Sequence, residues 1–451
     1  MSLTNFQNEF QKLLDRKYFS PELHPVRKDA FSKFEAIGFP TQKWENWRFT
    51  NLSALKENHY LISEVKDAPQ KTPDISNYKI EGLQTIVIYN GHFQQDISSV
   101  PEGVQLLTGS EYNELKNNQL NHSEKSPFDL LNTAFMDSGV CLIVGKNTIV
   151  GTPVRILFIS DGDSSIMVNP RLHIDIESGS LLTFIEEHVG NATSLFQNEA
   201  VYITIEKNSE VEHIRIQSSS ENTHHMANLH VEQFEDSQYN FYQYEDGGKF
   251  SRNNIYVDLN GENSECRINC LSLSRGTQHL DNNIVVNHNC PHTDSSQIVK
   301  SVLFDKSTGV FNGRTVVQKD AQKIVAHQSN KNLLLSKSAK MNSNPQLEIY
   351  ADDVKCSHGS TTGQLDDDAL FLIAEKSDGA LRDSLSLFDR LVSFSEKKLT
   401  YQDVANHLNI LDYQYYFNVT EHLISNDISS LFIIFNKIID NGFDGQHFIN
   451  G

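Results

Sequence analysis

The sequence is poor in cysteine and in long apolar runs. Five cysteines occur among 451 residues, an odd number with no Cys-x-x-Cys pair, so we expect no disulfide framework and a reducing compartment. No stretch approaches the roughly 18 consecutive apolar residues that cross a membrane. The N-terminus also has no basic segment followed by an apolar one, as an export signal would. These absences predict a cytoplasmic protein that makes no contact with a membrane.

Basic charge and catalytic motifs are scarce as well. The net charge of −20 and the isoelectric point near 5.3 argue against binding to the phosphate backbone of nucleic acids, because such proteins normally have a basic face. No GxxxxGKS/T phosphate-binding loop, no HExxH pair and no Ser-His-Asp order occurs. We therefore expect neither a nucleotide site nor a catalytic centre, and no direct binding to nucleic acid.

Hydrophobic spacing divides the chain into three regions. Residues 1–139 are expected to be helical and mixed, and the apolar residues near the start recur at helical spacing: Phe6, Phe10, Leu13 and Leu14, then Phe31, Phe34 and Ile37 before Gly38. Residues 140–365 change to a period of two, which predicts strands. Residues 366–451 return to helical spacing, with a helix start expected at 400–403 and a helix stop at 441–442.

A strand-turn-strand unit repeats through the middle region. Its turns are marked by Gly179, Ser209, Ser237 and Ser264, which lie 30, 28 and 27 positions apart. Units at such a constant interval have too little apolar surface to fold alone and bury it by stacking, which is typical of a β-solenoid. A sandwich of hairpins is the alternative, but its turns would recur every ~8–12 residues. We favour a mainly β fold with a solenoid core.

One thiol and one imidazole mark the end of the middle region. Cys356 and His358 follow an extended run from Pro345, and residues two apart in a strand share a face. Thiolate and imidazole bind zinc, copper and iron–sulfur clusters, but one pair cannot complete a four-coordinate site. The two residues are therefore a candidate metal site that needs donors from elsewhere. The alternative is a buried cysteine beside a core histidine.

A second group of donors is a weaker metal candidate. His288, Cys290 and His292 alternate along what looks like an extended segment, which would place three donors on one face. Pro291 interrupts this segment, however, and proline removes a hydrogen bond from a strand ladder. Packing is therefore the favoured interpretation.

The remaining cysteine and histidine pairs are given structural interpretations. Cys266 and Cys270 are four residues apart inside a repeat strand and are expected to be core residues of the solenoid. His224 and His225 are expected to be a polar pair in a loop, with no partner in the neighbouring sequence.

Several short motifs are specific to one known family. They are Gly38–Thr41, Trp47–Leu52, Phe311–Gly313, Asn332–Leu335 and the run Pro345–Gly363, which contains Cys356 and His358. Through these motifs the chain up to about residue 370 resembles the SufD family, whose members are subunits of the SUF iron–sulfur cluster assembly scaffold.

The resemblance implies a fold, a partner and a site. It implies an N-terminal helical part, a right-handed parallel β-helix core, and a non-catalytic scaffold that pairs with its paralogue SufB through the C-terminal end of the β-helix. It also implies that His358 is a ligand at the SufB–SufD interface, with Cys356 beside it, since both positions match the family motif. The iron–sulfur cluster would be bound transiently and shared with the partner.

After Phe371 the sequence departs from the SufD pattern. Residues 373–390 resemble the lid helices of the DNA polymerase III clamp-loader subunit gamma/tau, and Arg382 matches its nucleotide-sensing arginine. Without a phosphate-binding loop we expect Arg382 in a surface ion pair instead. Residues 366–371 suit both families, so we interpret residues 366–451 as a truncated clamp-loader segment in a chimeric fusion. The family's docking helices for the SufC ATPase would then be replaced, which makes SufC binding doubtful.

Two alternative functions remain. The C-terminal segment could be an interaction module that binds clamp-loader subunits. A β-helix could also be a carbohydrate-active enzyme, but such enzymes mostly act on secreted and often anionic substrates, whereas this acidic chain has no export signal and no basic groove. We favour the SufD-like scaffold over both.

Overall fold

The computed structural model describes residues 3–16, 21–63, 75–116, 126–136, 139–364, 367–394, 404 and 413–440. It divides the chain into two compact units, Met1–Asn332 with Lys337–Thr362, and Leu333–Ser336 with Gly363–Gly451. The helix start expected at 400–403 lies in a stretch of which only residue 404 is described, and the stop expected at 441–442 lies outside the described residues. None of the helices in the described ranges has the length and apolar character to span a bilayer.

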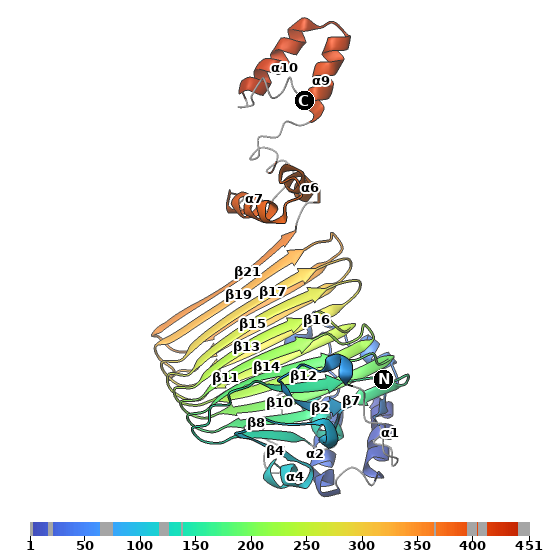
Figure 1. Cartoon of the computed structure of the whole chain (residues 1–451), viewed down its shortest axis with the longest axis vertical. Coiled ribbons are helices and arrows are strands. Elements are labelled where there is room, and N and C mark those ends of the chain that lie inside the picture. Colours follow the sequence, from blue (N-terminus) through green and yellow to red (C-terminus); the bar gives the residue numbers. More distant parts are fainter. Residues whose placement is uncertain are drawn as a thin grey trace. The chain divides into compact units, whose positions relative to one another are not determined.

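The first unit is built around a parallel β-solenoid, which confirms the predicted fold (Figure 1). Each coil contributes one strand to each of two sheets, so a strand pairs with the strand two places away in the sequence. One sheet has the order β20-β18-β16-β14-β12-β10-β8-β5-β4, with β1 and β7 beside this path. The other has the order β21-β19-β17-β15-β13-β11-β9-β6-β2-β3. Only β4 with β5 and β2 with β3 form antiparallel pairs among the registers described.

The strands of the first sheet are β1 (Leu61–Ile62), β4 (Val104–Thr108), β5 (Val140–Val144), β7 (Ser165–Val168), β8 (Arg171–Ile176), β10 (Ser194–Ile205), β12 (Thr223–Gln233), β14 (Phe250–Leu259), β16 (His279–His288), β18 (Thr308–Val317) and β20 (Lys340–Ile349). Those of the second are β2 (Gln84–Tyr89), β3 (His92–Phe93), β6 (Val154–Ile159), β9 (Leu181–Val189), β11 (Glu210–Gln217), β13 (Gln238–Glu245), β15 (Glu265–Ser274), β17 (Asp294–Leu303), β19 (Ile324–Leu334) and β21 (Val354–Gln364).

The corners of the solenoid explain the repeat seen in the sequence. The residue before each turn serine has a left-handed backbone, at φ 56° for Asn208, 55° for Asp236 and 60° for Asn263, and Gly179 takes the same place at φ 76°. Glycine, asparagine and aspartate are the residues that adopt this conformation at least cost. The serine hydroxyls then donate to carbonyl oxygens at the corner, as Ser237 Oγ does to Phe234 at 2.6 Å. A left-handed residue followed by serine therefore fixes each corner.

Alternation along the strands fills the space between the two sheets. In β9, β11 and β13 every second residue is buried, as the period of two requires. One half of the interior is apolar and includes Ile203, Val231 and Ile268. Cys266 and Cys270 are buried in this core, which confirms their interpretation as core residues.

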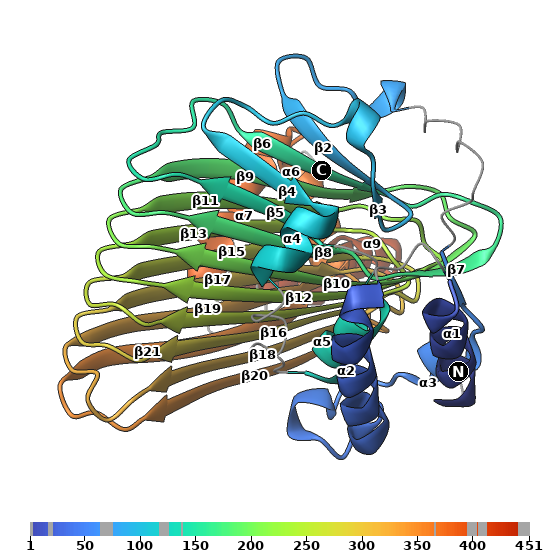
Figure 2. The same ribbon diagram turned by 90° about the horizontal axis from the view of Figure 1, so that it is seen from below.

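N-terminal helices cover the outer face of the first sheet, as Figure 2 shows. The helices are α1 (Leu3–Leu14), α2 (His24–Ile37), α3 (Ser53–Glu57), α4 (Gly109–Lys116) and α5 (Pro127–Phe135), with short 3-10 turns at Pro21–Leu23, Glu45–Trp47, Ser76–Tyr78 and Gln95–Ile97. Phe6, Phe10 and Phe34 pack in one cluster with Phe196 and Met226, which project from β10 and β12. The cover is why both faces of these two strands are buried.

The helical spacing expected before Gly38 is confirmed, because α2 ends at Ile37. Phe31 and Phe34 are buried, whereas Ile37 is 50% exposed. Ile37 is the last residue of α2, and Gly38 leaves the helix with φ 71°. The chain therefore turns away from the packed face at the point where Ile37 would have continued it.

The second unit contains helical hairpins. The helices are α6 (Asp367–Lys376), α7 (Leu381–Phe394), α9 (Tyr413–Ile424) and α10 (Ile428–Asp440). Asp378 and Gly379, both with positive φ, form the turn between α6 and α7, and Leu372, Ile373 and Leu391 are buried between these helices. Arg382 lies exposed in the first turn of α7, and the surface ion pair expected for it stays a prediction.

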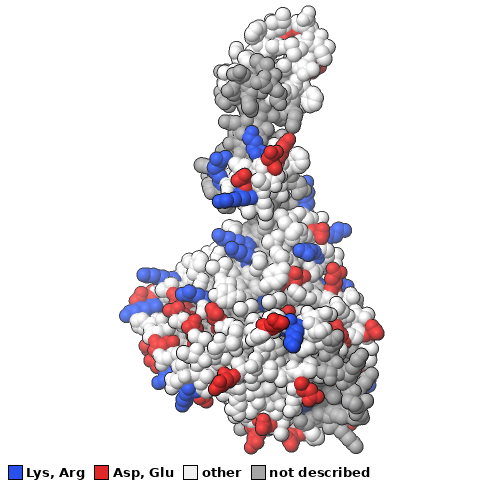
Figure 3. Space-filling model, in the orientation of Figure 1, with Lys and Arg blue, Asp and Glu red and all other residues white. Residues whose placement is uncertain are grey.

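Charges of both signs are mixed on the solenoid surface. On the face in Figure 3, Lys and Arg side chains lie interspersed with Asp and Glu side chains. Nucleic-acid binding surfaces are instead uniformly basic. The charges on the described part of this face are therefore not segregated by sign.

Candidate functional site

The last coil of the solenoid holds the predicted site residues. Strands β20 and β21 are the end strands of their sheets, so within the described residues each has one edge without a neighbouring strand. His358 in the middle of β21 is exposed, and Cys356 is half-buried against Ala326 and Val354. Residues two apart in a strand share a face, so His358 follows Cys356 on the inner face of β21, where no further coil of this sheet covers it.

Hydrogen bonds fix how β21 lies on the preceding strand of its sheet. Ser360 Oγ donates to Asn330 Oδ1 at 3.2 Å on the inner face. On the outer face, His327 Nδ1 lies 2.9 Å from Ser357 Oγ. Both pairs are offset by 30 residues, which is one coil, and on this register His358 lies directly above Gln328.

The environment of Cys356 does not favour a thiolate. Burial raises the pKa of the Cys356 thiol, and a backbone hydrogen bond at Ala326 opposes this in part. Metal binding needs the deprotonated thiolate, so Cys356 is the weaker donor of the predicted pair. His358 needs only a neutral imidazole, and it is exposed.

The second predicted metal candidate is not assembled. β16 ends at His288, and a turn follows it in which His292 has φ 60°, so the expected alternation is wrong. His288 is buried, its Nδ1 lies 2.7 Å from Thr293 Oγ1, and its Nε2 lies 2.8 Å from Ser295 Oγ. Both ring nitrogens are therefore already used in packing, which is the interpretation favoured from the sequence.

The expectation of a polar loop at His224 and His225 is also wrong. Both residues lie in β12 and are buried, and they point to opposite faces of its sheet. Tyr60 Oη lies 3.0 Å from His224 Nδ1 on the covered outer face. His225 faces the interior, where its Nε2 lies 3.2 Å from Glu199 Oε1. These partners come from remote parts of the chain, so the local sequence did not reveal them.

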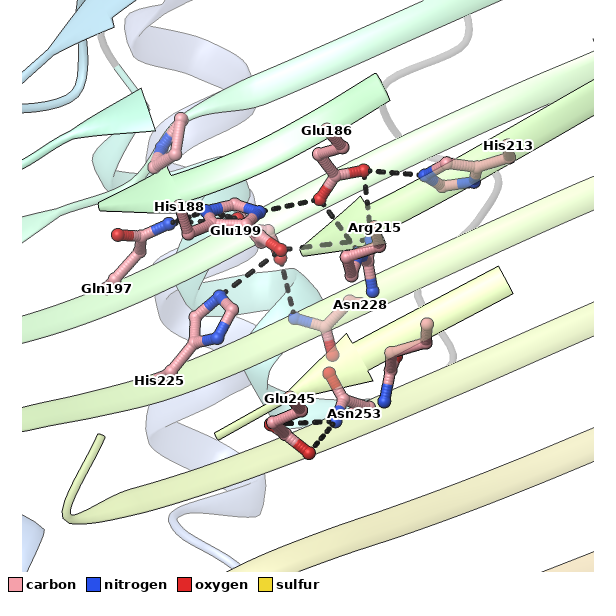
Figure 4. Close-up of polar contacts among 12 residues, drawn as sticks. Glu186, His188, Gln197, Glu199, His213, Arg215, His225, Asn228, Glu245 and Asn253 are labelled. Atoms are coloured by element: carbon pink, nitrogen blue, oxygen red, sulfur yellow. Dashed lines mark hydrogen bonds and ion pairs between the residues drawn. The ribbon is translucent and has the colours of Figure 1, made fainter. Parts of the chain in front are cut away.

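The polar half of the solenoid interior holds a network of charged and amide groups that the sequence analysis did not identify (Figure 4). Arg215 of β11 is fully buried, and its Nε donates to Glu186 Oε1 of β9 at 2.8 Å. His213 Nε2 lies 3.0 Å from Glu186 Oε2, and His188 Nε2 lies 2.8 Å from Glu186 Oε1. Glu186 is thus bonded by three side chains.

Burial and neighbouring charges set the protonation of these groups. Burial by itself would raise the pKa of Glu186, but Arg215 and the hydrogen bonds from His188 and His213 outweigh it and hold this pKa well below the usual range. Burial lowers the pKa of His213 to about 4, although Glu186 opposes the shift. Glu186 is therefore a carboxylate beside a neutral His213 at neutral pH.

A second carboxylate, Glu199 of β10, lies next to this group. His188 Nδ1 lies 3.4 Å from Glu199 Oε2, and the Gln197 amide donates to the same oxygen at 3.0 Å. Burial would raise the pKa of Glu199, but His188 and His225 outweigh it and lower this pKa. The carboxylate is thus held ionised between two imidazoles.

The network continues toward the later coils through Glu245 and neighbouring amide groups. Burial raises the pKa of Glu245 in β13, with hydrogen bonds from Ser251 and Asn253 opposing this in part. Asn253 Nδ2 also donates to Asn282 Oδ1 at 3.2 Å. The ion pairs of Arg215 with Glu186 and Glu199 lie in the early coils, on β9, β10 and β11.

A signal for this network exists in the sequence. Glu186 and His188 have the same parity in β9 as the buried residues Leu182 and Phe184, so the period-two pattern puts them on the inner face. Charged residues are rarely fully buried unless they are paired. Among the described residues, the one group of three or more potential metal ligands drawn from His, Cys, Asp and Glu is His188, Glu199 and His225.

Comparison with known proteins gives matches over most of the chain. Residues 158–376 match the family described as the SUF system FeS cluster assembly, SufBD core domain, and residues 2–156 match the SufBD protein N-terminal region. Iron–sulfur cluster assembly protein SufD of Escherichia coli (strain K12) is 30% identical over 358 residues, which are 78% of this chain and 83% of that protein.

Two further relatives have similar identity and coverage. An iron–sulfur cluster assembly SufBD family protein of Synechocystis sp. is 29% identical over 397 residues, 83% of this chain and 87% of that protein. Protein ABCI7, chloroplastic, of Arabidopsis thaliana is 26% identical over 369 residues, 77% of each chain. The matched family regions end at residue 376, so residues beyond it are not assigned by them.

Proposed function

Because this chain belongs to the SufBD family of iron–sulfur cluster assembly proteins, we propose that it is a non-catalytic scaffold subunit of SufD type. In this role it holds a nascent iron–sulfur cluster as cargo, together with a SufB-like paralogue, and passes the cluster on. The observation that carries the proposal is the exposed His358 on the open inner face of the last coil.

His358 is the residue of this chain that would contact the cluster. A single imidazole from this chain leaves the other coordination positions to a partner, so the cluster is held loosely enough to be transferred. Cys356 would take a secondary part, because burial keeps its thiol protonated and packed beside Ala326. The cluster is transient, and this chain has no role for a bound nucleotide.

The partner would dock on the free edges of β20 and β21. Both strands end their sheets, and an end strand presents unpaired N–H and C=O groups that another strand can bond. Pro345 within β20 is compatible with this position, since proline in sheets is confined mainly to edges. A SufB-like solenoid that stacked on this coil would bring its own ligands next to His358 in a heterodimer.

The test is anaerobic reconstitution of the cluster on the full chain with its SufB-like partner. His358→Ala should retain about tenfold less cluster than wild type by visible absorption and iron content. His327→Ala is the matched control, because His327 is also exposed but lies on the outer face of the neighbouring strand β19. Equal cluster content in the His358 and His327 variants would remove His358 from the site.

The C-terminal region and the compartment complete the proposal. We propose three regions, 1–139, 140–365 and 366–451, with the last as a clamp-loader-like segment in a fused chain. Weak binding to a SufC-like ATPase would follow, and firm co-purification with SufC would contradict it.

The family matches give no support to the clamp-loader or carbohydrate-enzyme alternatives. All five cysteines are free thiols, which suits the reducing cytoplasm.

A further inference from the structure

We propose that His188, Glu199 and His225 form a binding site for one divalent transition-metal ion inside the solenoid, separate from the site at His358. The potential ligand atoms of these three residues all lie within 4.8 Å of one another. Each side chain is at most 1% exposed. The three residues come from β9, β10 and β12, so the site exists only when the two sheets face each other.

The carboxylate of Glu199 lies between the two imidazoles. Its Oε2 is 3.4 Å from His188 Nδ1, and its Oε1 is 3.2 Å from His225 Nε2. The two imidazole ring centroids are 5.0 Å apart. A cation placed between these atoms would need only small side-chain movements to reach the ligand distances of about 2.0–2.2 Å typical of zinc.

His225 gives an independent indication that a ligand belongs here. Its Nδ1 has no hydrogen-bond partner within the described residues, although the side chain is 1% exposed. Its Nε2 has an ion-pair contact with Glu199 Oε1 at 3.2 Å, and the next cationic group near that oxygen is Arg215 at 3.8 Å. Buried polar atoms normally have a partner, and leaving one without costs about 1–3 kcal/mol. A cation coordinated by Nε2 would bridge His225 to Glu199 Oε1.

Glu186 supports His188 in the way that metal sites require. His188 Nε2 lies 2.8 Å from Glu186 Oε1, which fixes the proton on Nε2 and leaves Nδ1 directed toward Glu199. Carboxylate–histidine–metal arrangements of this kind orient the ring and increase its basicity. The Gln197 amide, which lies 2.8 Å from His188 Nδ1, must rotate when the ion binds.

The donor set indicates which ions fit. Two imidazoles and one carboxylate suit Zn²⁺ or Fe²⁺, whereas Mg²⁺ and Ca²⁺ prefer oxygen ligands alone. Glu186 and Glu199 carry two formal negative charges against the single guanidinium of Arg215, which lies 3.8 Å from Glu199 Oε1. The remaining charge of these groups is therefore negative, which attracts a cation.

The experiment measures zinc and cobalt binding by the full chain. Because the site is enclosed, the protein is refolded from denaturant with Zn²⁺ or Co²⁺ and then passed over a chelating resin. We expect one equivalent of Zn²⁺ per chain, and weak Co²⁺ absorption bands without a thiolate charge-transfer band. No retained metal, or a Co²⁺ spectrum with a thiolate band, would overturn the proposal even if no variant folded.

Matched variants locate the ion. His225→Gln should retain about tenfold less Zn²⁺ than wild type. His224→Gln should retain as much as wild type, because His224 is the buried neighbour on the opposite face of β12. Zinc retention that is equal in the two variants would contradict the site. His358→Ala should not change zinc retention, so this result and the cluster test can fail separately.

Discussion

Two histidines occupy equivalent inward-facing positions in different coils of the solenoid. Comparing them shows how the place of a coil in the stack changes the role of a residue. His213 and His358 both project from the inner face of the second sheet. Strand registers and hydrogen bonds place between them, coil by coil, Phe241, Ile268, Gln297 and Gln328. The two imidazoles thus occupy equivalent positions, one inside the stack and one on its last coil.

The difference between them is coverage by the next coil. His213 is fully buried, faces Glu186 and Tyr239 and has its pKa lowered to about 4. Its ring is committed to a structural network. His358 lies on the last strand of its sheet in the described part of the chain, and it is exposed. The same residue type is therefore structural in a covered coil and available as a ligand in an uncovered one.

Removing the guanidinium inside the stack should have the largest effect. Arg215→Met leaves Glu186 without the partner whose Nε and Nη2 lie 2.8 Å and 3.2 Å from its oxygens. Breaking one partner of a buried ion pair costs about 3–5 kcal/mol. We expect the free energy of unfolding, measured by urea denaturation, to fall by that amount.

An exposed arginine provides the control for this substitution. Arg267 pairs with Glu265 at 3.5 Å, and the two side chains are 61% and 43% exposed. Surface ion pairs contribute about 0–1 kcal/mol, so Arg267→Met should change stability little. Equal losses for Arg215→Met and Arg267→Met would show that coverage by coils does not strengthen the interior network.

The second-largest effect on stability is expected from acid, which should destabilise the covered coils. Burial lowers the pKa values of His213 and His288 from 6.5 to about 4. In the unfolded chain these two histidines become protonated near pH 6.5, whereas in the folded chain they stay neutral until about pH 4. The contribution of these neutral histidines to the free energy of unfolding is fully present above pH 6.5. It falls as the pH drops from 6.5 to about 4, by on the order of 3 kcal/mol per histidine.

The pH range of this loss distinguishes protonation of the histidines from protonation of the buried carboxylates. The pKa values of Glu186 and Glu199 are lowered from 4.5, so these carboxylates keep their contribution until lower pH. Thermal melts at pH 7, 6 and 5 should show a smaller drop in stability for His288→Gln than for wild type. A His288→Gln slope as steep as that of wild type would contradict the assignment.

The smallest effect on stability is expected at the uncovered histidine. His358→Ala should change the free energy of unfolding by less than about 0.5 kcal/mol, because the side chain is exposed and surface substitutions rarely do more. Urea denaturation of the same preparation used for cluster reconstitution checks this. A loss of 2 kcal/mol or more, on the scale of a core substitution, would mean that any cluster defect reflects damage to the fold.

The repeat and the coil-stacking fold could be predicted because they depend on patterns within short stretches of sequence. Alternation in β9 and β11 and the corner residues Asn208 and Asn263 need only the period of a strand and the backbone freedom of asparagine. The exposure of His358 agrees with its predicted availability, and its role as a ligand stays a prediction.

The interior network could not be assembled from sequence alone. Glu186 and Glu199 are 13 positions apart, but Arg215 and His225 reach them from other strands, one coil further along. The error at His224 and His225 has the same origin, since a polar pair in sequence can be split between a covered outer face and a closed interior. The odd or even position of a residue along a strand predicts which face of the sheet its side chain occupies. Which residues of other coils that side chain contacts depends on how the coils stack.

The sequence by itself determined the coil length, the corners, the apolar half of the core and the place of Cys356 and His358 near the end of the stack. These follow from steric and hydrophobic rules that act within one coil. The tertiary structure decided which polar side chains meet inside and which imidazole stays uncovered. Those outcomes depend on desolvation and charge pairing between residues that approach only when successive coils stack.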